Sequence, residues 1–169
     1  MTSTTELYPG ADDDRGSGYR DWLARVTSTY EAIHYTCAHR LNEPSLAGQV
    51  AVQVVAGLIA RPMVFRYFGL PYSGRIATLA EGYIADAEAG NLTLVGEWPR
   101  LYARLREVPA EHQEVFVGVC VAGDDLAGLA ERLGCDEREA APRRTATLEL
   151  MRDLASAFLP ESFRAHEED

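Results

Sequence analysis

The sequence predicts an all-α protein built from two small helical units. From Tyr19 onward, apolar side chains recur at the three- and four-residue spacing of a long amphipathic helix: Trp22, Val26, Tyr30, Ile33, Cys37 and Leu41. The end of the chain shows the same helical spacing, at Leu148, Met151, Ala155 and Phe158. The alternation of Val50, Val52 and Val54 has β-strand character, but no second segment of similar quality offers it a pairing partner.

The first unit begins with the long helix. Residues 1–18 are predicted to be a disordered tail, and the helix is expected to start at Tyr19. After a turn containing Pro44, Ser45 is expected to cap a second helix. The mostly apolar segment 46–60 is predicted to be that helix, buried at the centre of the protein, with a strand as the alternative.

A third helix completes the first unit and a linker follows. Ser73 is expected to cap this helix, and Gly90 to end it. Its expected inner face consists of Ile76, Leu79, Tyr83 and Ala87. Pro99 is well placed in the first turn of a short helix within the linker. The expected organisation is therefore a tail, a first unit, a linker, a second unit and an acidic tail, at residues 1–18, 19–90, 91–108, 109–160 and 161–169.

Charge and composition exclude several functions. The chain has 169 residues, of which 47% are hydrophobic and 25% charged, as in a globular protein. With 16 basic and 26 acidic residues, its net charge of −10 opposes non-specific attraction to nucleic acid and anionic membranes. Every basic residue is arginine. Because there is no lysine, side-chain Schiff-base catalysis, pyridoxal-phosphate attachment and a Walker-type phosphate loop are excluded.

Other classes of site are also disfavoured. The longest apolar run, residues 50–60, is too short to cross a bilayer, and the first residues lack the order of a secretory signal, so we expect a cytoplasmic protein. The cysteines are far apart and are expected to be reduced: Cys37, Cys120 and Cys135. His34, Cys37 and His39 share one helix, where at most two side chains converge. We therefore expect no metal site and no cofactor.

The second unit has the spacing of a helix-turn-helix. Between Glu111 and Leu154 the order is helix, glycine, short helix, tight turn and helix, with Gly134 in the turn and small Ala130 where the helices approach. This stretch resembles the fourth conserved region of extracytoplasmic-function (ECF) sigma factors, whose pattern runs from "P-x-x-x-x-E-V" through a glycine to "x-x-x-x-I-A-E-x-L-G-C". The matching residues are Pro109, Glu114, Val115, Gly123, Leu129-Ala130-Glu131 and Leu133-Gly134-Cys135.

Residues 19–61 resemble the second conserved region of the same family, in which an aromatic-rich helix leads to "R-L", a short acidic turn with proline and "A-E-D-L-V-Q-E-V-F". The corresponding residues are Arg40-Leu41, Asn42-Glu43-Pro44 and 47–55. The resemblance implies a transcription regulator that binds core RNA polymerase and promoter DNA and can be the target of an anti-sigma protein. It places polymerase binding at Gln49 and Gln53. Arg138, Arg143 and Arg144 are the candidates for DNA contact, with a solvated helix face, in which acidic residues alternate with them, as the alternative.

The chain departs from the family where the family binds its partners. Gly48-Gln49 stands where the family carries Glu-Asp for the polymerase clamp. In the recognition helix, Ala141 replaces a phosphate-binding lysine, and Pro142 implies either a kink or a helix that begins at this proline. Residues 108–160 contain ten acidic residues and five arginines, whereas DNA readers are normally basic.

These departures support two alternatives. The first is a sigma-like scaffold that has lost DNA binding and binds or acts on a small molecule, as an enzyme or cyclase, in an aromatic pocket of the first unit. The candidate pocket residues are Tyr30, His34, Tyr67, Tyr72 and Tyr83. The second is an acidic protein-interaction module. The sequence shows no Ser-His-Asp set, phosphate loop or metal-carboxylate pair, so no catalytic residue is assigned, and ordinary helix packing also accounts for the aromatic residues.

Overall fold

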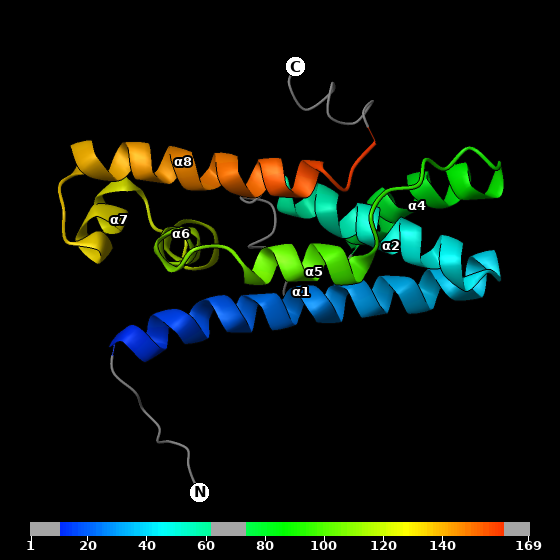
Figure 1. Ribbon diagram of the computed structural model, residues 1–169, viewed down its shortest axis with the longest axis horizontal. Helices are drawn as coiled ribbons and strands as arrows, with labels where there is room; N and C mark the ends of the chain where they lie inside the picture. The colour runs from blue at the N-terminus through cyan, green and yellow to red at the C-terminus, as the bar shows by residue number, and fades with distance from the viewer. Residues whose placement is uncertain (1–10, 62–73, 161–169) are drawn as a thin grey trace, which may run out of the picture.

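The computed structural model describes residues 11–61 and 74–160, with the side chains of 11–17 and of residue 75 left aside. Every regular element in these ranges is helical, which confirms the all-α prediction. The elements are α1 (Ala11–Leu41), α2 (Pro44–Ile59), α4 (Gly74–Glu88), α5 (Trp98–Arg106), α6 (Ala110–Phe116), the π-helical segment η1 (Val117–Val121), α7 (Leu126–Leu133) and α8 (Glu137–Ser156). Figure 1 shows α1 and α8 along the two long sides of the molecule, with α5 and α6 between them.

The first helix is longer than predicted. It begins at Ala11 rather than Tyr19, so residues 11–18, which the sequence assigned to a disordered tail, have a helical backbone. It ends where Asn42 adopts a left-handed conformation with φ of 56°, which turns the chain toward α2. The expected cap at Ser45 is wrong, since α2 already starts at Pro44, a residue suited to the first turn of a helix.

Helix α2 forms the centre of the protein. The prediction of a helix rather than a strand is confirmed, and twelve of its sixteen residues are buried, so α2 needs neighbours on all sides. It packs against α1, α4, α5 and α8. Helix α4 supplies Ile76, Ala80 and Ile84 to this core and ends before Gly90, whose φ of 76° confirms the predicted glycine stop. Ser73, the expected cap of this helix, lies outside the described residues.

The two predicted units share one hydrophobic core. Helix α1 extends past the first unit and contacts α6 and η1, while α8 contacts α2 and α5. Trp22 on α1 packs edge-on against Phe116 on α6, with ring centroids 4.6 Å apart. Pro99 lies in the first turn of α5, as predicted. The linker therefore runs along a continuous core rather than between two separate ones.

Candidate functional site

Helices α7 and α8 form a helix-turn-helix with well-defined ends. Gly134 closes α7 in a left-handed conformation, with φ of 73°, and the Cys135 amide donates to the Ala130 carbonyl at 3.0 Å. Asp125 and Asp136 cap the two helices, because their carboxylates accept hydrogen bonds from Gly128 N (2.8 Å) and Glu139 N (2.9 Å). These local signals fix the turn that the sequence predicted.

A close contact between a side chain of α7 and the backbone of η1 supports this motif. Arg132 on α7 pairs with Asp124 at 2.7 Å, and its side chain crosses Gly118 in η1. A Cβ atom at residue 118 would lie 2.7 Å from Arg132 Nε, so only glycine leaves room for the guanidinium. The pair ties α7 to the π-helical segment, and it directs Arg132 inward rather than toward a partner.

The three arginines assigned to DNA contact do not share one face of α8. At about 100° per residue, Arg138 and Arg143 are separated by roughly 140° around the helix. Arg138 is exposed opposite the buried Ala140–Thr147 side, whereas Arg143 faces α6. Arg144 is half-buried on the other flank. Within the described part of the chain, none of the three forms an ion pair. Arg138 and Arg143 are both exposed, and Arg138 lies farther around the helix from the buried side of α8.

The proline in α8 does not start the helix. The expectation of a reading helix that begins at Pro142 is wrong, because Asp136 caps the helix and α8 runs from Glu137 through Pro142 to Ser156. The proline has no N–H, so the carbonyl of Arg138 lacks its usual helical donor. Pro142 is exposed, and the helix continues past it with Thr147 and Met151 buried against the core.

A pocket of about 450 Å³ lies between α6 and α8, beside Arg143. Glu111, His112 and Thr147 line it, and His112 Nδ1 lies 2.7 Å from the hydroxyl of the fully buried Thr147. This contact explains why a polar Thr147 is tolerated in the core, since a buried hydroxyl needs a hydrogen-bond partner.

The two glutamines assigned to polymerase binding are buried. The Gln49 amide donates to Val95 O (2.9 Å) and accepts from Val95 N (2.7 Å), and Gln53 Nε2 donates to Thr93 O (2.6 Å). We call these four residues the linker clamp. Gln49 is 8% exposed and Gln53 is fully buried. Both side chains therefore hold the linker on α2 rather than face a partner protein.

The structure brings two of the five predicted pocket residues together. Tyr30 and His34 line a cavity of about 310 Å³ with Gly48, Glu97 and Trp98. The ring of Tyr30 stacks on Trp98, with centroids 4.4 Å apart and planes 9° from parallel. Burial raises the pKa of the Tyr30 hydroxyl, and the carboxylates of Glu97 and Glu31 raise it further.

The other three predicted pocket residues do not join this cavity. Tyr83 lies apart on α4, and burial raises its pKa to about 12 against an opposing effect of Arg61. Tyr67 and Tyr72 lie outside the described residues. Trp98 was missed because its place in a connecting segment gave no periodic signal, although an aromatic residue directly before Pro99 at a helix start was the available clue.

Within the described ranges, no group of three or more histidine, cysteine, aspartate or glutamate side chains could hold a metal ion. No helix in the same ranges is long and apolar enough to span a membrane. Comparison of the chain with protein-family models, with curated proteins and with solved structures finds no match.

Proposed function

We propose that this chain is a divergent sigma-factor-like transcription regulator that binds promoter DNA through α7 and α8 and also binds core RNA polymerase. The observation that carries the proposal is the capped helix-turn-helix at one end of the molecule. In Figure 1, α7 and the start of α8 lie at the end of the molecule opposite α4. The first half of α8 is mostly exposed, as entry into a DNA major groove requires.

The charges of this surface suggest how it would read DNA. Arg138 lies in the first turn of α8 and faces outward, the position from which a guanidinium reaches a guanine edge. Its neighbours Glu137 and Glu139 are exposed and oppose phosphate contact. Binding should therefore depend on base contacts more than on the phosphate backbone, and its affinity should fall only shallowly with salt.

Polymerase binding at Gln49 and Gln53 would require the linker to leave α2. The linker clamp buries the hydrogen-bonding groups of both side chains against Thr93 and Val95. A polymerase that used this face would have to replace those bonds, since an unpaired buried amide costs about 1–3 kcal/mol. The alternative is that polymerase contacts a different surface.

The first experiment is direct binding of the purified protein to core RNA polymerase at near-physiological salt, with an authentic ECF sigma factor as positive control. We expect a complex in the nanomolar range. The absence of a complex at tens of micromolar would contradict the polymerase half of the proposal.

The second experiment selects DNA sequences from a random duplex pool and measures their affinity by fluorescence anisotropy. Arg138→Ala should weaken binding to the selected sequence by about tenfold or more, as the loss of a base contact predicts. Arg152→Ala is the matched control, because Arg152 is also exposed on α8 but lies in its second half. Equal effects of the two variants, or a pool without enrichment, would contradict sequence-specific reading by α8.

A second candidate function is small-molecule binding in the cavity beside Tyr30. The stacked Tyr30–Trp98 pair offers an aromatic wall, and His34 and Glu97 add polar groups. The test is a thermal-shift screen of metabolites, followed by Tyr30→Leu. A hit that still stabilises the Tyr30→Leu variant equally would not bind at this cavity.

A further inference from the structure

A second basic feature lies away from α8, in a groove between α1, α5 and α6. The groove has a volume of about 610 Å³ and is lined by Arg20, Tyr102, Arg106 and Gln113, with Tyr19 and Leu23 beneath them. We call it the arginine groove. Its volume falls within the range of small-molecule sites in proteins, about 300–1,000 Å³.

The local charge is opposite to that of the whole protein. Helix α5 carries Arg100, Arg104 and Arg106 and no acidic residue, although the chain has a net charge of −10. The described residues that line the groove include Arg20 and Arg106 but no carboxylate. Within residues 11–61 and 74–160, neither of these two guanidinium groups forms an ion pair. Two unpaired guanidinium groups that face one groove form a site for an anion.

The backbone beside both arginines is held in place by one buried hydrogen bond. The Tyr19 hydroxyl donates to the Leu105 carbonyl at 2.8 Å. Tyr19 precedes Arg20 and Leu105 precedes Arg106, so this bond fixes the separation of the two arginines at their backbones. On the third side, Gln113 Nε2 donates to Val108 O at 2.8 Å. Such a frame reduces the ordering that ligand binding would otherwise require.

An aromatic ring lines the same groove as the two arginines. Tyr102 is half-buried, and the guanidinium carbon of Arg106 lies 5.9 Å from its ring centroid. A groove lined by an aromatic ring and two guanidinium groups matches a ligand that combines a phosphate with a planar base.

We propose that the arginine groove binds a nucleotide, with its phosphate between Arg20 and Arg106 and its base against Tyr102. The ligand is either a free nucleotide or one residue of a single-stranded nucleic acid, and the chemistry of the groove is the same for both. The site does not depend on the proposed helix-turn-helix function, because none of its residues lies on α7 or α8.

The test measures fluorescence anisotropy of three probes with the full chain: N-methylanthraniloyl-ATP, N-methylanthraniloyl-GTP and fluorescein-labelled oligo(dT). We expect at least one probe to bind in the micromolar range. Arg20→Ala and Arg106→Ala should each weaken binding by about tenfold. Arg104→Ala is the matched control, because it removes the same charge from the same helix outside the groove, and it should change affinity less than twofold.

Further arms separate the outcomes. Binding of oligo(dT) alone would assign the site to single strands, and binding of the labelled nucleotides alone would assign it to free nucleotides. Tyr102→Leu should weaken binding of the labelled nucleotides. The affinity for inorganic phosphate, measured by competition, should stay unchanged. No binding of any probe at about 1 mM would overturn the proposal. An equal loss in Arg104→Ala would also overturn it, since non-specific attraction to α5 would then explain the binding. Arg138→Ala should leave this binding intact, so failure of the helix-turn-helix proposal is distinguishable.

Discussion

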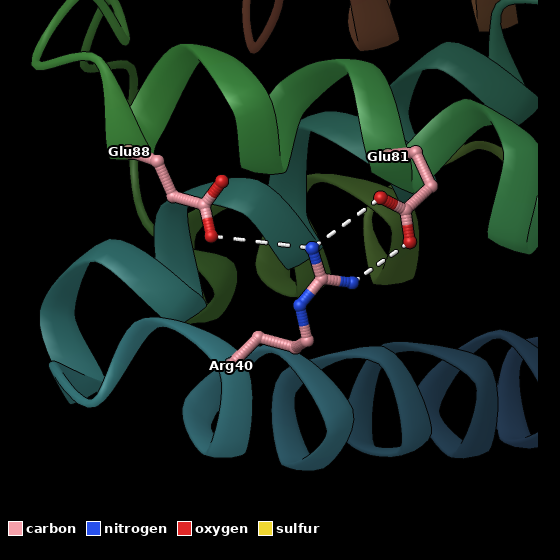
Figure 2. Close-up of polar contacts among 3 residues, drawn as sticks. All are labelled: Arg40, Glu81 and Glu88. Atoms are coloured by element: carbon pink, nitrogen blue, oxygen red, sulfur yellow. Dashed lines mark hydrogen bonds and ion pairs between the residues drawn. The ribbon is translucent and has the colours of Figure 1, made fainter.

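Two polar contacts join distant parts of the chain, and they differ in burial. The linker clamp connects Gln49 and Gln53 with a segment about forty residues further along the chain, through bonds of 2.6–2.9 Å. The second contact, which we call the Arg40 cluster, connects α1 with α4. Arg40 pairs with Glu81 at 2.8 Å and approaches Glu88 at 4.0 Å, as Figure 2 shows.

The comparison teaches that burial, rather than formal charge, decides how much each contact stabilises the fold. The three side chains of the Arg40 cluster are 43–56% exposed, so water and salt compete for their charges. The clamp glutamines are neutral but shielded, so loss of either leaves backbone groups of the linker without partners. Even the clamp is not fully satisfied, because Gln53 Oε1 is buried with no hydrogen-bond partner among the described residues.

The largest effect is expected from Gln49→Met, which keeps the side-chain length but removes both bonds to Val95. We expect the free energy of unfolding to fall by about 2–4 kcal/mol, because two bonds to Val95 and a longer bond to Gln53 are lost and two backbone groups are left poorly solvated. Urea denaturation measures the change. Gln113→Met is the matched control, with one bond lost and a decrease of about 1 kcal/mol. Equal decreases in the free energy of unfolding of the two variants would show that the linker clamp stabilises the fold no more than a single hydrogen bond does.

A somewhat smaller effect is expected from a methyl group beside the clamp. In Gly96→Ala the new Cβ would lie 2.7 Å from Cε1 of the buried Phe158, so the linker or the ring must shift, at a cost of about 1–3 kcal/mol. Gly82→Ala is the control. It meets nothing within 4 Å and should stabilise α4 by about 0.5–1 kcal/mol. The Tm should therefore fall in Gly96→Ala and rise in Gly82→Ala. An equal decrease of the Tm in both variants would show that the contact between residue 96 and Phe158 is not the cause.

Raising the pH should destabilise the region beside the Arg40 cluster. Burial raises the pKa of the Cys37 thiol to about 11, and Arg40 partly opposes this rise. Between pH 9 and 11 the unfolded chain loses this proton while the folded chain keeps it, so the free energy of unfolding falls as pH increases. At pH 10 we expect the free energy of unfolding to fall by less than it does in Gln49→Met or in Gly96→Ala at neutral pH.

Denaturation curves from pH 8 to 10.5 measure this effect, with Cys37→Ala as the comparison. The variant should show a shallower decrease, while Tyr83, whose pKa is also raised, still contributes. Identical slopes would contradict the assignment to Cys37.

The smallest effect is expected from Arg40→Gln. This change removes the ion pairs with Glu81 and Glu88, but all three side chains are well solvated. The midpoint of urea denaturation should stay within experimental error, at low and at high salt. A decrease comparable to that of Gln49→Met would reverse the comparison between the two contacts.

Much of the fold could be predicted from the sequence because its signals are local. The helical period of α1, the glycine stop at Gly90 and the turn at Gly134 each depend on residues within a few positions. The boundaries were less predictable. Helix α1 starts earlier than the buried stripe, and α8 begins before Pro142, because Asp136 supplies a cap and the exposed proline leaves the core side intact.

The candidate sites were less predictable because they depend on helices that meet across long separations in sequence. Family resemblance placed Gln49 and Gln53 on a binding surface, yet the linker buries them. Tyr30 was identified, but its partner Trp98 was not, since no periodicity connects the two. Arg106 and Arg20 are 86 positions apart and meet only after α1 and α5 pack.

Local sequence signals were sufficient to predict an all-helical chain, a glycine-closed helix-turn-helix and a central apolar α2, because periodicity and backbone preference act within one or two helical turns. Helix packing places the linker along α2, Arg143 beside α6, and Arg20 and Arg106 in one groove, and no local signal predicts these positions. The direction of each of these side chains depends on which helices cover it, and the covering helices are in place only when the whole core is assembled.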